Sequence, residues 1–268
     1  MIAILFHLSL LFLWCRVWTR DDHAFFFNPH ISGPMRVVDR ILNALRTPLP
    51  FLPNRVLAAL ALLGVLALKT LAFPRIQDGI PLAFSYGLRL EVWAFLIFTF
   101  QIAAIHAVLR LSSRQRSSRA AQTVELVSRP VSFLRPVALQ LPAALLGIAV
   151  CVLLADVIER LPAAPTTLAL LSKSRDVFPW GVALRHGVDI LHVWSHCLLL
   201  AVLVSWLEIF RPRNYAASCA REYTSFLLGR LSGLLLVGMM DLTPLVAFIV
   251  LDNLHRWLAG VLGVAAGC

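Results

Sequence analysis

Two histidines four residues apart are the strongest candidates for chemistry in this sequence. They lie in the stretch His192-Val-Trp-Ser-His196, inside an apolar run, and Asp189 comes three residues before the first of them. Side chains four apart share a helix face, and imidazole is a common ligand of metal ions and haem iron. Together with His255, from a later apolar run, these residues could bind haem, a chlorophyll-type pigment or a metal ion. The interpretation that we favour is that the histidines lie near the membrane interface, hydrogen-bonded to water, headgroups or neighbouring helices.

Three carboxylates form a second candidate. Asp156, Glu159 and Asp252 are expected toward the outer ends of their apolar runs. Ionisable groups inside a membrane span can mark an ion path, whereas carboxylates at helix ends are simply reached by water. The chain has no Walker loop and no GxSxG, HExxH or paired-carboxylate motif. We therefore predict that it is not an enzyme.

The third candidate is Asp241, which interrupts an apolar stretch at 225–251. Thr243 suits a helix N-cap and Pro244 the first helical position, so Asp241 would precede a helix N-terminus, where negative charge is favoured. The alternative is a buried functional carboxylate inside the membrane. The piece before Asp241 is then interfacial or re-entrant, and its Gly229 and Gly233 are spaced for close helix contact.

The elements that must position these residues are membrane helices. Of the 268 residues, 59% are hydrophobic and only 14% are charged, and the mean hydropathy is +0.81. Soluble domains are about 45–50% apolar and about 25% charged. The composition predicts an all-α, polytopic membrane helix bundle. Six runs are nearly or fully long enough to span: 2–18, 53–73, 92–111, 137–158, 188–210 and 244–264.

The six runs form three similar pairs. After the first, third and fifth runs comes an Arg-rich stretch of about thirty residues, which ends at Pro53, Pro142 and Pro244 respectively. The nearly equal distance from the start of each Arg-rich stretch to its proline indicates an internal repeat. We expect three units of spanning helix, basic interfacial helix and spanning helix, at residues 1–73, 92–160 and 187–264.

The Arg-rich stretches set orientation and lipid contacts. Fifteen arginines lie in the first, third and fifth loops, against six Lys or Arg in the second and fourth. The positive-inside rule then places both termini outside. The net charge of +10 indicates anionic headgroups rather than nucleic acid. We expect these headgroup-contacting residues: Arg36, Arg40, Arg114, Arg116, Arg211 and Arg213.

Two of the stretches contain apolar side chains at helical spacing, as interfacial helices do. The middle stretch is interrupted by Pro130. The expected apolar stripes are Val38, Ile41, Leu42 and Leu45 in the first stretch, and Tyr223, Phe226, Leu227, Leu231 and Leu234 in the last.

The C-terminal third resembles a known family. It has Ser205-Trp206 at the end of one run, then a basic loop, then Gly238-Met-Met-Asp241-Leu242-Thr243-Pro244 opening the next. This pattern resembles the YggT (Ycf19-like) membrane proteins, whose repeat has a Ser-Trp, a basic loop and a Gly-x-x-Asp-Leu-Ser-Pro element. The resemblance covers residues 187–264 best. It implies roles in envelope organisation, cell division, osmotic tolerance or assembly of membrane complexes.

These observations predict a multi-pass protein of the bacterial inner membrane with other integral membrane proteins as partners. We expect a non-catalytic scaffold, assembly factor or accessory subunit, without a bound cofactor. Two alternatives remain open. One is a solute or ion transporter or channel linked to osmotic tolerance, and the other is a haem- or pigment-binding subunit that uses His192 and His196.

Overall fold

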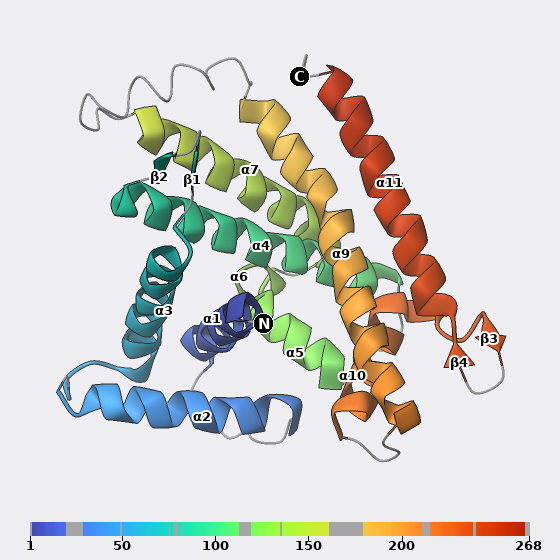
Figure 1. Ribbon diagram of the computed structural model, residues 1–268, viewed down its shortest axis with the longest axis horizontal. Helices are drawn as coiled ribbons and strands as arrows, with labels where there is room; N and C mark the ends of the chain where they lie inside the picture. The colour runs from blue at the N-terminus through green and yellow to red at the C-terminus, as the bar shows by residue number, and fades with distance from the viewer. Residues whose placement is uncertain are drawn as a thin grey trace. The chain divides into compact units, whose positions relative to one another are not determined.

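The computed structural model describes residues 2–19, 29–48, 50–74, 76–77, 80–81, 83–112, 119–134, 136–160, 179–210, 215–237 and 240–265. These residues form α1 (Ile2–Trp18), α2 (Pro29–Arg46), α3 (Asn54–Ala72), β1 (Ile76–Gln77), β2 (Ile80–Pro81), α4 (Phe84–Ser112), α5 (Arg119–Val127), α6 (Arg129–Ser132), η2 (Val137–Leu139), α7 (Gln140–Arg160), α9 (Pro179–Phe210), α10 (Tyr215–Leu228), η4 (Gly229–Leu231), β3 (Leu236–Val237), β4 (Met240–Asp241) and α11 (Thr243–Ala265). Figure 1 shows their order along the chain.

The fold is helical, and part of it is suited to a membrane. Among the described residues, four helical segments are long and apolar enough to cross one: 54–72, 84–111, 137–155 and 243–262. They belong to α3, α4, η2 with α7, and α11. The remaining predicted runs correspond to α1 and α9.

Prolines help to define where two of the candidate membrane helices begin. Pro53 directly precedes α3, its carbonyl accepting the N–H groups of Val56 and Leu57. α11 begins at Thr243, with Pro244 in its first turn. Proline suits these positions because the N–H that it lacks would have no helical partner there.

The chain divides into two compact units. The first contains residues 1–95 and 125–129, and the second contains 96–124 and 130–268, so α4 contributes to both. In the first unit α1 packs on α3, and α2 contacts both of them. Two charged pairs join its helices: Arg16 Nε lies 2.7 Å from Asp39 Oδ1, and Lys69 Nζ lies 2.6 Å from Glu91 Oε2.

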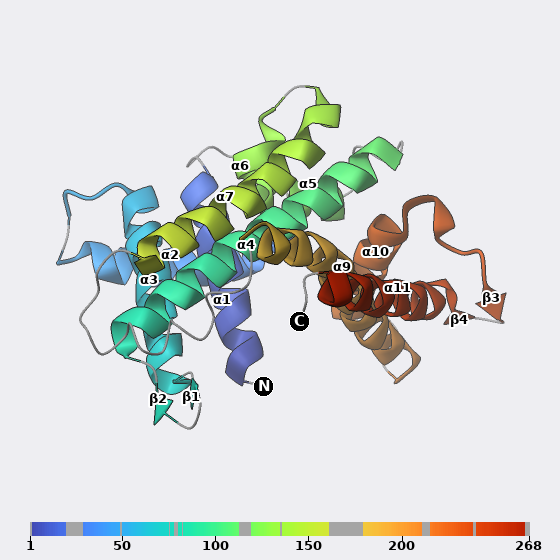
Figure 2. The ribbon, with the colours of Figure 1, turned by 90° about the horizontal axis from the view of Figure 1, so that it is seen from above.

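The second unit is organised around α9. This helix packs on α11, α10 and α7, and Figures 1 and 2 both show α9 and α11 running side by side. An apolar core joins α9 to α4, α5 and α10, and Leu109, Ala120, Leu198 and Phe226 are buried in it. α9 is thus the element that holds this unit together.

The amphipathic stripes differ from those predicted. In α2, Val38 and Leu42 are buried whereas Ile41 and Leu45 are exposed, because α2 packs on α1 and α3 instead of lying free at an interface. α10 ends at Leu228, with Phe226 and Leu227 buried in the core. The last predicted stripe therefore does not continue as α-helix, since Leu231 ends the short 3-10 helix η4 and Leu234 follows it.

The helix contact expected from Gly229 and Gly233 is also wrong. The two glycines do not share a helix face, since Gly229 follows the end of α10 and Gly233 lies in the turn after η4. Both have positive φ, 56° and 79°, a conformation that glycine adopts without a Cβ penalty. Their role is to turn the chain.

Candidate functional site

The candidate site lies where α9 faces α11, and it is in the middle of both helices. α9 begins nine residues before the predicted run, so His192 is 13 residues after Pro179 and 18 before Phe210. His255 is 12 residues after Thr243 and 10 before Ala265. The expectation that Asp252 lies toward the outer end of its apolar run is therefore wrong. At about 1.5 Å per residue, Asp252 and His255 lie at the centre of α11.

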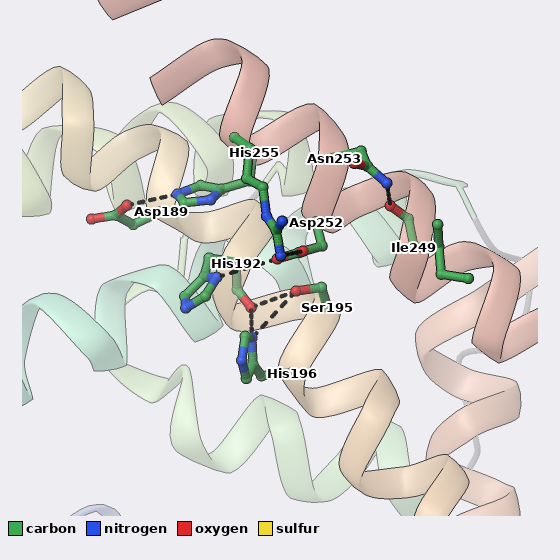
Figure 3. Close-up of polar contacts among 9 residues, drawn as sticks. Asp189, His192, Ser195, His196, Ile249, Asp252, Asn253 and His255 are labelled. Atoms are coloured by element: carbon green, nitrogen blue, oxygen red, sulfur yellow. Dashed lines mark hydrogen bonds and ion pairs between the residues drawn. The ribbon is translucent and has the colours of Figure 1, made fainter. Parts of the chain in front are cut away.

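Asp189 is the carboxylate that links the two helices. Its Oδ1 lies 3.0 Å from Nε2 of His255 on α11, and its Oδ2 lies 3.2 Å from Nδ1 of His186 on α9 (Figure 3 shows the link to His255). Because a carboxylate oxygen only accepts hydrogen bonds, the facing nitrogen of each imidazole carries a hydrogen. One aspartate thus accepts from two histidines.

Asp252 is the corresponding carboxylate on α11. Its Oδ2 lies 2.6 Å from Nη2 of Arg256, one helical turn later. Its Oδ1 lies 3.8 Å from Nδ1 of His192, within ion-pair range but too far for a hydrogen bond. A salt bridge within α11 and a weaker contact across to α9 therefore hold this side chain.

The imidazole rings connect these two carboxylates. The ring of His192 lies 4.9 Å from the ring of His255 and 4.1 Å from the ring of His196, measured between centroids. His196 donates from Nδ1 to the backbone carbonyl of His192 at 2.9 Å, and Ser195 donates to the same carbonyl at 2.8 Å (Figure 3). At the end of the array, the ring of His196 lies 6.3 Å from the ring of Phe248 at an interplanar angle of 83°. The array consists of His186, Asp189, His192, His196, Asp252, His255 and Arg256.

This geometry favours hydrogen bonding over metal binding. No group of three or more His, Cys, Asp or Glu side chains in the described residues is placed to hold a metal ion. His192 and His196 contact each other, whereas a metal held between them would lie about 2 Å from a nitrogen of each. The array can pin α9 to α11, and its imidazole nitrogens can both donate and accept hydrogen bonds.

The array contains two residues that the sequence reasoning missed. His186 lies three positions before Asp189 on the same helix face, and Arg256 lies four positions after Asp252. The repeat of ionisable residues at 186, 189, 192 and 196 follows helical spacing and is the signal that could have found His186. Asp156 and Glu159 fall in the C-terminal part of α7, but their side chains lie outside the described residues.

Asp241 occupies a different site, at the start of α11. Its Oδ1 accepts the N–H of Thr243 at 2.9 Å, and its Oδ2 accepts the N–H of Gly233 at 3.1 Å. The Thr243 hydroxyl accepts the N–H of Leu235 at 2.9 Å, and the Leu242 carbonyl accepts the first helical N–H groups. The predicted N-cap is therefore displaced: Asp241 caps the helix, and Thr243 ties it to the β3–β4 hairpin.

The remaining sequence-predicted residues are spread over the molecule. Pro244 is buried in the first turn of α11, and Arg36 and Arg40 are exposed on α2. Ser205 and Trp206 lie in α9, with side chains outside the described residues. Five further predicted residues lie wholly outside that part of the chain: Arg114, Arg116, Arg211, Arg213 and Gly238.

No protein-family model, no curated protein and no solved structure matches the chain.

Proposed function

We propose that this protein is a YggT-like integral membrane protein of the bacterial cytoplasmic membrane. In this proposal it acts without catalysis, as a scaffold, assembly factor or accessory subunit of a larger membrane complex. α1 and α9 cross the membrane together with α3, α4, α7 and α11, which makes six spans with both termini outside.

The order of elements supports a threefold unit. An apolar helix, one or two more polar helices and a second apolar helix occur as α1–α2–α3, as α4–α5–α6–α7 and as α9–α10–α11. Within the described residues, only the last has a β-hairpin before its second apolar helix, formed by β3 and β4. The residues of the Asp-Leu-Thr-Pro element belong to this hairpin and helix start, so the resemblance to YggT proteins is concentrated where the units differ.

The observation that carries the proposal is the outward face of α11. Five exposed apolar side chains of α11 recur at spacings of three or four, so they lie along one side of the helix. The carboxylate and imidazole of Asp252 and His255 lie on the other side, toward α9. An apolar face of this length suits either lipid tails or the helix of a membrane partner. It consists of Val246, Val250, Leu254, Trp257 and Val261, all exposed.

Site-specific crosslinking tests the proposal. A photoreactive amino acid replaces Val250 or Trp257 in the full-length chain in native membranes, and Leu198, buried in the core, serves as the matched control. We expect the two outward positions, and not the control, to form crosslinks to a defined set of integral membrane proteins. Crosslinks to lipid alone, together with saturable solute flux by the purified protein in liposomes, would eliminate the scaffold.

A second candidate function is ion translocation, favoured by the ionisable array between α9 and α11. Ionisable residues in the middle of a span are costly and commonly functional. The array follows α9 from His186 to His196, or about 15 Å at about 1.5 Å per residue, roughly half of the hydrocarbon thickness.

Proton flux into proteoliposomes that contain a pH-sensitive dye tests this candidate. If protons cross through the array, Asp189→Asn should abolish the flux that the wild-type protein supports. Asn253→Ala is the control, because Asn253 is exposed on α11 and bonds to the Ile249 carbonyl of its own helix. Flux that is equal in both variants, or absent from the wild type, would exclude the array as a path.

A further inference from the structure

The segment between α10 and α11 exposes four leucines close together in the chain. The exposed fractions are 54% for Leu231, 65% for Leu234, 46% for Leu235 and 65% for Leu236. By contrast, Phe226, Leu227 and Leu228, at the end of α10, are buried. Leucines left in water forgo the stabilisation of burial, about 1.5–3 kcal/mol for each side chain that is fully covered.

The backbone of this segment is held in place, so the exposure of the leucines is a property of the fold. β3 pairs with β4 in antiparallel register, Leu236 opposite Asp241. Asp241 accepts the N–H of Gly233, Thr243 accepts the N–H of Leu235, and the Leu235 carbonyl accepts the N–H of Leu242. Gly233, at a φ of 79°, makes the turn. These bonds anchor residues 233–242 to the start of α11, while the four leucine side chains of the segment remain exposed.

The position of the hairpin indicates what covers it. β4 ends at Asp241, two residues before Thr243, the first residue of a candidate membrane span. Figures 1 and 2 show β3 and β4 projecting beyond the first turn of α11. A segment joined so closely to the end of a span lies at the boundary between headgroups and acyl chains. Its paired backbone suits that environment, where unpaired N–H and C=O groups are costly.

We propose that residues 231–236 form a lipid-inserted wedge, which enters the acyl boundary of the leaflet at the N-terminal end of α11. The occupant of this surface is bilayer lipid, whereas the proposed partner-binding surface is the outward face of α11. The wedge therefore adds a lipid contact to the protein contacts of the proposed function and does not depend on them. Asp241 and Thr243 position the wedge, through the hydrogen bonds that tie it to the start of α11.

Spin-label accessibility tests the wedge. Single cysteines replace Leu234 or Leu236 in a full-length chain whose native cysteines are changed to serine or alanine. The labelled protein is reconstituted alone into vesicles of phosphatidylethanolamine and phosphatidylglycerol. Oxygen concentrates in the acyl region and a nickel chelate in water, so their relative access to a nitroxide reports its depth. Val250→Cys is the reference for a lipid-facing site and Leu227→Cys the reference for a protein-covered site.

We expect the labels at 234 and 236 to be several-fold more accessible to oxygen than to nickel, as at 250. Greater access to nickel would place the wedge in water, and low access to both reagents, as at 227, would show that protein covers it. Either result overturns the proposal. Asp241→Ala in the Leu234→Cys chain adds a further test, since releasing the hairpin should raise access of nickel to the label. Unchanged access would remove the positioning role of Asp241.

Discussion

At the scale of residues, several ionisable side chains within the described helices are paired. Arg16 with Asp39, Lys69 with Glu91, and Asp189 with His186 and His255 all lie within 3.2 Å. A charge moved out of water is costly unless a partner and hydrogen bonds compensate it. The pairs therefore restrict how neighbouring helices can rotate, because any rotation that separates the partners leaves a charge without compensation.

The pair of Lys69 and Glu91 provides a direct test. Their side chains are only 16% and 9% exposed and 2.6 Å apart. Glu91→Gln should lower the free energy of unfolding by about 3–5 kcal/mol, since it leaves the ammonium group without its carboxylate. Unfolding in a graded mixture of mild detergent and SDS measures the change. The double variant Lys69→Met/Glu91→Gln should recover much of the loss, and a double variant as unstable as the single one would contradict this account.

Asp241 offers a second test at this scale. Asp241→Ala removes the acceptor for both the Thr243 N–H and the Gly233 N–H, and should destabilise the protein by about 1–2 kcal/mol. Asp241→Asn retains one carbonyl oxygen and should cost less. Thr243→Val should cost about 1 kcal/mol by leaving the Leu235 N–H unpaired. The same unfolding assay ranks the three variants, and equal stability of the alanine and wild-type proteins would remove Asp241 as a cap.

At the scale of elements, small residues set how closely α4 and α7 approach. Ala103 and Ala104 of α4 pack with Ala144 of α7 in a buried cluster. A Cβ placed on Gly147 would lie 2.4 Å from the Phe100 ring. Helices in membranes associate through such close contacts because lipid tails are as apolar as leucine and give no hydrophobic drive between helices.

Gly147→Ala should therefore destabilise the protein by about 1–3 kcal/mol through overpacking against Phe100. Gly64→Ala in α3 is the matched control, because nothing lies within 4 Å of its added Cβ. There the gain in helix propensity should make the variant neutral or more stable by up to about 1 kcal/mol. Thermal unfolding of both proteins in detergent compares them. If the two substitutions have the same effect, steric contact between α4 and α7 is not the reason for glycine at 147.

At the scale of the whole molecule, the distribution of arginine gives a prediction of topology. The proposed orientation places residues 19–52, 112–136 and 211–240 on the cytoplasmic side of the membrane, with the wedge at 231–236 in the cytoplasmic leaflet. Phe51 and Phe133, both exposed, should become labelling sites on that side when changed to cysteine in a background without native cysteines. An impermeant maleimide added to spheroplasts should not label them. It should label Ala83→Cys, which lies before α4, and labelling of Phe133→Cys from outside would reverse the orientation.

The sequence by itself determined the class of the protein and the approximate extent of its long helices. Hydropathy over about twenty residues depends only on the local sequence. A proline favours the first turn of a helix whatever packs around it, because it lacks a backbone N–H. The predicted starts near Pro53 and Pro244 therefore match α3 and α11. The break near Pro130 likewise separates α5 from α6.

Only the tertiary structure decided which distant residues meet. Asp189 bonds to His255 across 66 positions, and Phe226 turns inward because α9, α4 and α5 cover it. After α10 the chain turns into the β3–β4 hairpin instead of continuing the expected helical stripe to Leu234, because Asp241 and Thr243 accept N–H groups from residues eight positions earlier. Helix periodicity shows which side chains share a face, but the rotation that brings one face against another depends on packing over the whole unit.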